Sequence, residues 1–359
     1  NLQRAVQRGE KEYDLCLRCD VHTPGHTQWF YFAVSNTYPP DLLAAFDEGK
    51  SVTYPKYRFN ITNLTKPDSL FNQGMRPVVY SCRDAKTKGT GWVRSGSNIS
   101  YYSNPFTRGN AAGEGVATYF SLSFTLELTN PRDTYLVAYS YPYTYTDNKA
   151  HIQQLLGKPG AKDIIKHSVL CNTISGADLD LLVITNFRDK ENLGPIYNMS
   201  TGKIDAADTQ SKSARKKAKM NRKALVISAR VHPGGIYVLL CFVDDDHRLH
   251  FLLCSLETPA SWMMRGALDF LTSNNPNAKL LRQAYVIYVV PMLNPDGVIF
   301  GNNRCGLAGV DLNRQWKNPT KSLHPTVFAL KTLLQEQKTV REISMYIDLH
   351  GHSRKYNIF

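Results

Sequence analysis

The first 147 residues carry the partial alternation of apolar and polar side chains that is typical of short β-strands. Runs rich in β-branched and aromatic residues are separated by Pro, Gly and Asn, as in sheets whose strands are joined by turns. The predicted strands are Tyr13–Val21, Gln28–Val34, Tyr57–Ile61, Val78–Ser81 and Tyr119–Leu128. Residues 1–147 are therefore predicted to fold as an antiparallel β-sandwich. The aromatic residues in this region need no further explanation than an ordinary sandwich core with surface aromatics.

From about residue 148 the pattern changes to strands that alternate with helices. Short, continuously apolar runs are typical of buried strands, and apolar residues three or four positions apart are typical of helices. The predicted strands are Leu181–Asn186, Ala224–Val231, Tyr285–Val290 and Ile343–Asp348, and the predicted helices are Ser261–Leu271 and Thr326–Gln337. This alternation predicts that residues 148–359 form an α/β domain with a mixed sheet and helices on both of its faces.

Length and composition agree with two folded domains. A chain of 359 residues of which 42% are hydrophobic can bury two cores, which excludes a disordered chain. The net charge of +13 favours anionic partners, which are acidic peptides, nucleic acid or a membrane surface, without choosing among them. Seven cysteines without regular spacing indicate a reducing compartment rather than a disulfide framework.

Two segments narrow the choice of partner. The longest apolar stretch, residues 235–256, is divided by Asp244-Asp245-Asp246-His247-Arg248, whereas a membrane span needs about 20 uninterrupted apolar residues. The polar segment 188–223 ends in a basic run that is interpreted as a solvated loop, with a nuclear signal or nucleic-acid patch as the alternative. It lacks the interleaved aromatics on which bases stack. No membrane or nucleic-acid partner is expected, and no signal peptide opens the chain, so a cytosolic location is predicted.

Candidate metal ligands follow the predicted buried strands. His232 and His350 stand at the carboxyl ends of two of these strands, where open α/β sheets bind their ligands. One such histidine is more often structural than catalytic, but a pair of them favours function. If residues 235–256 were removed, Glu257 would stand three positions after His232 in the motif His-Pro-Gly-Glu. Histidine, glutamate and histidine, with a fourth position for water, form a known ligand set for catalytic zinc.

These residues, with the motifs Asn294-Pro295-Asp296-Gly297, Asp311-Leu312-Asn313-Arg314 and Asp348-Leu349-His350-Gly351-His352, resemble the zinc carboxypeptidases. The surrounding sequence resembles the cytosolic carboxypeptidase branch, whose members trim glutamates from protein tails such as those of tubulin. The phrases His26–Phe32, Phe71–Pro77 and Tyr141–Thr146 resemble the β-rich domain that precedes the peptidase domain in this branch. The resemblance covers nearly the whole chain except residues 235–256 and part of 188–223.

The resemblance implies a role for each candidate residue. Zn²⁺ would be bound by His232, Glu257 and His350, the last preferred over His352 because the family motif aligns on the first histidine. Asn313 and Arg314 would bind the terminal carboxylate of the substrate, for which a guanidinium is the natural bidentate receptor. Arg304 would polarise the scissile carbonyl and stabilise the developing oxyanion. The implied partners are acidic C-terminal tails, and the implied location is the cytosol, with association to microtubules.

Two features predict that this chain itself is inactive. The 22 residues 235–256 separate His232 from Glu257, and their boundaries suggest a retained intron. A genuine loop that returns Glu257 to the zinc is the alternative, but it would expose apolar residues beside an active site. The chain also ends at Phe359, before the general base and the specificity pocket that the resemblance implies.

The expected fold is thus an N-terminal β-sandwich and a zinc carboxypeptidase domain truncated at its C-terminus, with an exposed sheet edge and reduced stability. The alternative function is a binding module that holds acidic protein tails without cutting them. A third hypothesis, nucleic-acid binding, depends on the basic loop alone.

Overall fold

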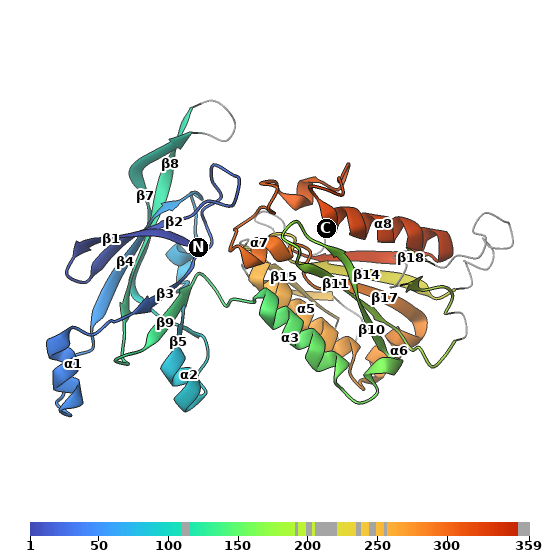
Figure 1. Cartoon of the computed structure of the whole chain (residues 1–359), viewed down its shortest axis with the longest axis horizontal. Coiled ribbons are helices and arrows are strands. Elements are labelled where there is room, and N and C mark those ends of the chain that lie inside the picture. The colour runs from blue at the N-terminus through green and yellow to red at the C-terminus, as the bar shows by residue number, and fades with distance from the viewer. Residues whose placement is uncertain are drawn as a thin grey trace. The chain divides into compact units, whose positions relative to one another are not determined.

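The computed structural model describes residues 1–109, 115–190, 193–198, 203–204, 221–234, 238–243, 249–254 and 257–350 (Figure 1). The chain forms two compact units. The first contains residues 1–142 and 301–303, and the second contains residues 143–300 and the chain from Arg304 on. The predicted boundary at 147/148 lies inside helix α3 (Tyr145–Leu156). This helix starts early because Thr144 and Asp147 form a capping box, in which the Asp147 N–H donates to Thr144 Oγ1 at 3.1 Å.

The first unit contains two sheets. One has the order β1-β2-β4-β8-β7, and the other has the order β3-β9-β5-β6. Their strands are β1 (Leu2–Gly9), β2 (Glu12–Leu17), β3 (Tyr31–Ser35), β4 (Lys56–Leu64), β5 (Val78–Ser81), β6 (Val93–Arg94), β7 (Ser97–Gly109), β8 (Val116–Glu127) and β9 (Thr134–Ala138). Three short helices accompany them, α1 (Pro40–Asp47), α2 (Cys82–Lys88) and η1 (Leu70–Gln73).

Aromatic side chains join these two sheets. The ring centres of Phe32 on β3 and Phe59 on β4 are 5.9 Å apart, and those of Phe30 and Phe124 are 6.2 Å apart. Such pairs add to the large area that each ring buries. The predicted sandwich is confirmed, with one difference: β2 pairs with β4 in parallel. Between β2 and β4 in sequence comes β3, which belongs to the other sheet. The connection from β2 to β4 is therefore a crossover rather than a hairpin.

The second unit is built on a mixed sheet with the order β10-β11-β17-β14-β18. Its strands are β10 (Ile165–Asn172), β11 (Asp178–Ile184), β14 (Lys223–Ala229), β17 (Tyr285–Val290) and β18 (Ile343–Leu349). β14 pairs in parallel with both β17 and β18, while β10 and β11 are antiparallel to their neighbours. The predicted mixed sheet is therefore confirmed. Among the described residues β18 forms one edge of the sheet, and Met345 on it is 55% exposed.

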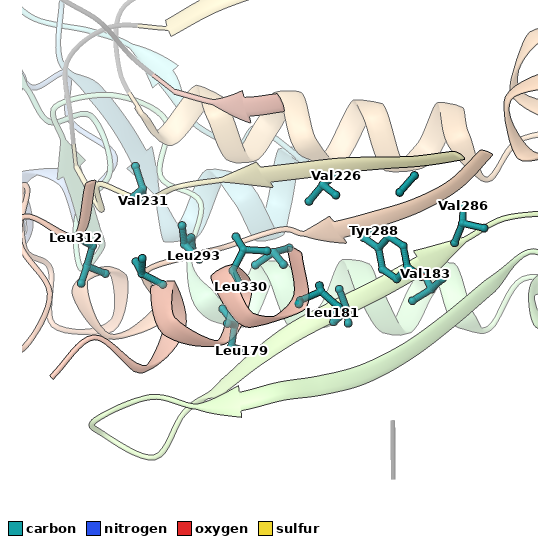
Figure 2. Packing of buried hydrophobic residues seen from close by; sticks show 14 of the residues in the cluster. Leu179, Leu181, Val183, Val226, Val231, Val286, Tyr288, Leu293, Leu312 and Leu330 are labelled. Atoms are coloured by element: carbon teal, nitrogen blue, oxygen red, sulfur yellow. The ribbon is translucent and has the colours of Figure 1, made fainter. Parts of the chain in front are cut away.

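Helices cover both faces of this sheet (Figure 1). The helices described in the second unit are α3, α5 (Glu257–Leu271), α6 (Pro276–Ala284), α7 (Pro295–Ile299), α8 (Pro325–Val340), η2 (Ala161–Asp163) and η3 (Leu312–Arg314). Because side chains alternate along a strand, Leu181 and Val183 pack with α8, whereas Leu182 and Ile184 pack with α3 and α5. Figure 2 shows the first of these clusters, with Leu330 of α8 among side chains of the sheet. Each fully buried side chain of this kind stabilises the unit by about 1.5–3 kcal/mol.

Two hairpins lie outside this sheet. β12 (Tyr197–Asn198) pairs with β13 (Lys203–Ile204), and β15 (Val238–Val243) pairs with β16 (Leu249–Cys254). The second hairpin forms the described part of the segment 235–256, and whether that segment is an intron product or a genuine loop stays a prediction. The basic run at 211–220 lies outside the described residues. Within the described residues, no helix is both long and apolar enough to span a membrane.

Candidate metal and substrate site

The two predicted histidine ligands come together at one end of the mixed sheet. β14 and β18 are parallel neighbours, with Ser228 opposite Asp348 and Ala229 opposite Leu349. His232 and His350 follow these strand ends, and their ring centres are 4.7 Å apart. Two imidazoles this close are within reach of a single metal ion. The carboxyl ends of neighbouring parallel strands thus form the candidate site, as the sequence predicted.

Asp311 orients the first of these histidines. Its Oδ1 atom lies 2.8 Å from Nε2 of His232, whose side chain is almost completely buried. Burial alone would raise the pKa of Asp311, but the hydrogen bond and charge of His232 and the charge of Arg304 outweigh it and hold that pKa well below its usual range. Asp311 is therefore a carboxylate at neutral pH, and it fixes the ring of His232 through Nε2.

This arrangement fits a zinc ion. In metal-binding histidines, the ring nitrogen that does not bind the metal commonly donates its N–H to a carboxylate. Because Nε2 of His232 is bonded to Asp311, Nδ1 is the nitrogen that would bind the metal. The third predicted ligand, Glu257, is the first residue of α5, but its side chain lies outside the described residues. Among the side chains that are described, no group of three His, Cys, Asp or Glu residues could hold a metal ion.

The second histidine has a carboxylate beside it as well. Asp348 Oδ2 lies 3.4 Å from Nδ1 of His350. The other oxygen of Asp348 accepts a hydrogen bond of 3.0 Å from the hydroxyl of Ser228 on β14, which also lies 2.7 Å from the hydroxyl of Tyr346. Burial raises the pKa of Tyr346, so its phenol stays protonated and can donate. The predicted alternative ligand, His352, lies outside the described residues.

Arg304 shares the carboxylate that orients His232. Its Nε donates to Asp311 Oδ2 at 2.9 Å, and its Nη2 lies 2.6 Å from the same oxygen. The side chain of Arg304 is 36% exposed, so solvent reaches part of it. Asp311 therefore links the predicted oxyanion arginine to the first predicted metal ligand.

Asn313 and Arg314 follow Asp311 in the short helix η3. The Asn313 N–H donates to Asp311 Oδ1 at 2.8 Å, so Asp311 also caps this helix. The Asn313 side chain accepts a hydrogen bond of 3.1 Å from Trp316 Nε1, which fixes its amide. Arg314 is exposed, and among the described residues it has no hydrogen bond or ion pair to the other candidate residues. The structure thus brings together His232, His350, Arg304 and Asn313, but leaves the side chain of Arg314 outside that network.

The motif Asn294-Pro295-Asp296-Gly297 supports the loop that carries His232. The Asn294 side-chain amide donates to the Val231 carbonyl oxygen at 3.1 Å. Gly297 packs so closely that a Cβ atom at this position would lie 2.3 Å from Cγ of Pro233. Asp296 is buried and accepts hydrogen bonds from the hydroxyls of Thr173 and Ser175. This motif is therefore a scaffold for the site, and the absence of a Cβ at Gly297 is required for it.

Asp311 was missed as a functional residue by sequence reasoning. It opens the motif Asp-Leu-Asn-Arg, and the available signal was an aspartate placed to cap the turn that carries Asn313. A cap explains its bond to the Asn313 N–H, but the bonds to His232 and Arg304 join residues distant in sequence and follow from the fold.

The family model and the full-length relatives that this chain matches are all carboxypeptidases. Residues 255–358 match the model of the zinc carboxypeptidase family. The whole chain is 40% identical over 359 residues to cytosolic carboxypeptidase 2 of Xenopus tropicalis and 38% identical over 363 residues to human cytosolic carboxypeptidase 1. The chain spans 30% and 25% of the lengths of these two relatives.

Solved structures share the fold. A putative carboxypeptidase A from Shewanella denitrificans aligns over 97% of this chain and 66% of its own, with 19% identity and a TM-score of 0.60. A metallo-carboxypeptidase from Pseudomonas aeruginosa, in complex with (2-guanidinoethylmercapto)succinic acid, aligns over 98% of this chain and 67% of its own, with 21% identity and a TM-score of 0.56.

Proposed function

We propose that the chain, whose residues 255–358 match the zinc carboxypeptidase family, is part of a cytosolic metallocarboxypeptidase that removes C-terminal residues from acidic protein tails. The observation that carries the proposal is the arrangement around Asp311. One carboxylate orients a histidine that faces a second histidine, and it also binds an arginine beside them.

In the proposed reaction the chain holds the substrate and the metal in fixed positions. A bound zinc ion would supply a Lewis acid and an activated water for attack on the peptide bond. His232 and His350 would hold it, with Glu257 as the third ligand. Asp311 keeps the His232 ring in the required orientation. The Arg304 guanidinium would donate hydrogen bonds to the scissile carbonyl oxygen as negative charge develops on it.

We propose that the terminal carboxylate of the substrate binds Asn313 and Arg314. Arg314 is exposed and forms no ion pair among the described residues, so its guanidinium is available to a carboxylate. The net charge of +13 would attract polyanionic tails, and such attraction weakens as salt screens it. Glutamate-rich tails, such as those of tubulin, are the proposed substrates, and association with microtubules would follow from that choice.

A binding module that holds acidic tails without cleaving them is the second candidate. The segment 235–256 favours it, because it separates His232 from Glu257 where the family motif places them three residues apart. Loss of the carboxylate ligand would weaken zinc binding and abolish hydrolysis, while the carboxylate receptor at Asn313 and Arg314 would remain. We propose this role for the chain with residues 235–256 in place.

Peptide hydrolysis separates the two functions. Zinc-loaded protein, extended beyond Phe359 to the full length of the family's peptidase domain, is prepared with and without residues 235–256. It is incubated with peptides that end in Glu-Glu-Glu or in Leu-Phe, and released amino acids are measured. The proposal expects release of glutamate by the protein that lacks 235–256. Preference for the Leu-Phe peptide would contradict the acidic substrate but keep the carboxypeptidase. Saturable binding of the acidic peptide without cleavage, by both proteins with zinc bound, would favour the binding module.

A further inference from the structure

Arg230 occupies an unusual position between β14 and the loop that carries His232. Its φ angle is +60°, in the left-handed region that non-glycine residues rarely adopt. Its side chain is charged, yet the residue is only 2% exposed. A strained backbone and a buried charge persist only where the surrounding structure holds them in place, and they concentrate at functional sites.

The guanidinium of Arg230 joins three segments of the second unit. Nε donates to the carbonyl oxygen of Pro233 at 2.7 Å, next to His232. Nη1 donates to the hydroxyl of Ser261 at 2.9 Å, and the same nitrogen lies 3.3 Å from the carbonyl oxygen of Tyr143. Ser261 is buried and stands four residues after Glu257, at the start of α5.

This bridge connects the two metal-binding elements by a route that bypasses the chain between them. His232 lies on the loop whose carbonyl Arg230 binds, and Glu257 begins the helix whose hydroxyl Arg230 binds. Along the backbone, residues 235–256 separate the two elements. Because a guanidinium is a rigid planar fork, it can fix two acceptors relative to each other in a way that a flexible ammonium cannot.

We propose that Arg230 is a positioning residue for the metal site, which holds the His232 loop and the first turns of α5 at the spacing that a shared zinc ion requires. The inference rests on the proposed function. This role gives a reason for the strained backbone at Arg230. With this backbone conformation, the side chain reaches both the Pro233 carbonyl of its own loop and Ser261 on α5.

Arg282 offers a matched control. It is also a buried arginine of the second unit, and its Nη1 donates to the backbone carbonyl of Leu271 at 2.5 Å. Leu271 is the last residue of α5, so Arg282 anchors the end of that helix that lies far from Glu257. Replacement of either arginine by lysine removes a guanidinium fork from α5 and keeps the positive charge.

The test measures zinc affinity of the full chain by competition with a chromogenic chelator, together with thermal unfolding of the metal-free protein. Arg230→Lys should weaken zinc binding about 10- to 100-fold, the usual effect of losing a residue that orients a metal ligand. Arg282→Lys should lower the unfolding temperature to a similar extent but leave zinc affinity within about threefold of wild type. Unchanged zinc affinity in Arg230→Lys, or an equal loss in both variants, overturns the inference.

A milder variant keeps the test decisive if Arg230→Lys fails to fold. Ser261→Ala removes one acceptor of the bridge, should weaken zinc binding in the same direction, and should not add its full effect to that of Arg230→Lys. Wild-type affinity in Ser261→Ala contradicts a bridge to α5 while the proposed function stands. Zinc binding only after removal of residues 235–256 overturns this inference while the proposed function stands, and no zinc binding with or without the segment overturns both.

Discussion

At the scale of single residues, Asp311 explains more of the candidate site than any other side chain described. It contacts His232, Arg304 and the backbone of Asn313, which are three parts of the proposed machinery with different roles. The neighbouring His232 and Arg304 lower its pKa, so its negative charge lies beside one cationic and one potentially cationic group. A single carboxylate thus joins the proposed metal ligand His232 to the proposed oxyanion arginine, Arg304.

Replacement of Asp311 by asparagine should therefore weaken zinc binding about 10- to 100-fold, because an amide is a poorer orienting partner for His232. Asp180 provides the control. It is another buried aspartate of the same unit and lies on β11. Its Oδ1 is 2.8 Å from Nε2 of His167 on β10. Asp180→Asn should lower stability and leave zinc affinity unchanged. Chelator competition on both variants checks this, and an equal loss of affinity would show that Asp311 has no special role.

Replacement of Arg304 and replacement of Arg314 should have different kinetic effects. Arg304→Ala should depress turnover about a hundredfold or more, the usual loss for a donor to an oxyanion, with a smaller effect on substrate affinity. Arg314→Ala should weaken binding and turnover of every peptide alike, because it removes the receptor for the terminal carboxylate. Steady-state kinetics of the protein that lacks 235–256 and is extended beyond Phe359 to the family's full length separate kcat from KM. An Arg304→Ala variant with normal kcat would contradict the proposed role.

At the scale of elements, the bounds of strands were predicted best where a clear turn or helix signal stood at both ends of an apolar run. β5 and β17 have the predicted bounds, because each is a short apolar run between turn residues or helix ends. β7 was not predicted, since it is a largely exposed strand in which Ser, Asn and Thr outnumber apolar residues. α3 was not predicted because aromatic residues around its capping box were interpreted as part of the β-domain.

The candidate site shows the same division. His232 and His350 could be predicted to meet, because both follow buried strands and parallel strands end at one edge of a sheet. The hydrogen bonds of Asp311 and Arg230 could not, because they join side chains to partners that only the packed fold brings near.

The junction of α3 with α5 should make the second unit sensitive to mild acid. His151 on α3 is buried, and its Nε2 lies 3.2 Å from Asp269 Oδ1 on α5. Burial lowers the pKa of His151 from 6.5, although the bond with Asp269 acts in the opposite direction. Because the unfolded chain then binds this proton more tightly, the stability due to neutral His151 is present above pH 6.5 and is lost as pH falls through the lower folded pKa.

Urea unfolding between pH 8 and pH 5 checks this expectation. The slope due to one such group is at most about 1.4 kcal/mol per pH unit. His151→Gln should flatten the decline below pH 6.5, even if the variant is less stable at pH 8. An identical decline in wild type and variant would assign the acid sensitivity to other groups.

At the scale of the whole molecule, the open question is how the segment 235–256 relates to the site. It stands between His232 and Glu257 in sequence, and its described part is the hairpin of β15 and β16. The Arg230 bridge offers a physical reason why α5 can stay beside the His232 loop with this segment in place.

The messenger RNA shows whether residues 235–256 come from a retained intron. If residues 235–256 come from a retained intron, amplification across their codons should give a mature product shorter by 66 nucleotides, three for each of the 22 residues. That product would encode His-Pro-Gly-Glu. Abundant cytoplasmic message of the longer form alone would show that the segment is a genuine loop of the protein.

Zinc retention after dialysis is the most direct test of the proposal that the ends of β14 and β18 form the metal site of a carboxypeptidase. The chain is compared with His232→Gln and His350→Gln variants, each with and without residues 235–256, and zinc is measured per mole of folded protein. We expect the strongest retention, near one zinc per chain, in the protein that lacks the segment, weaker retention with the segment present, and loss in both histidine variants. Zinc retained equally by the histidine variants, or bound by none of the proteins, would contradict it.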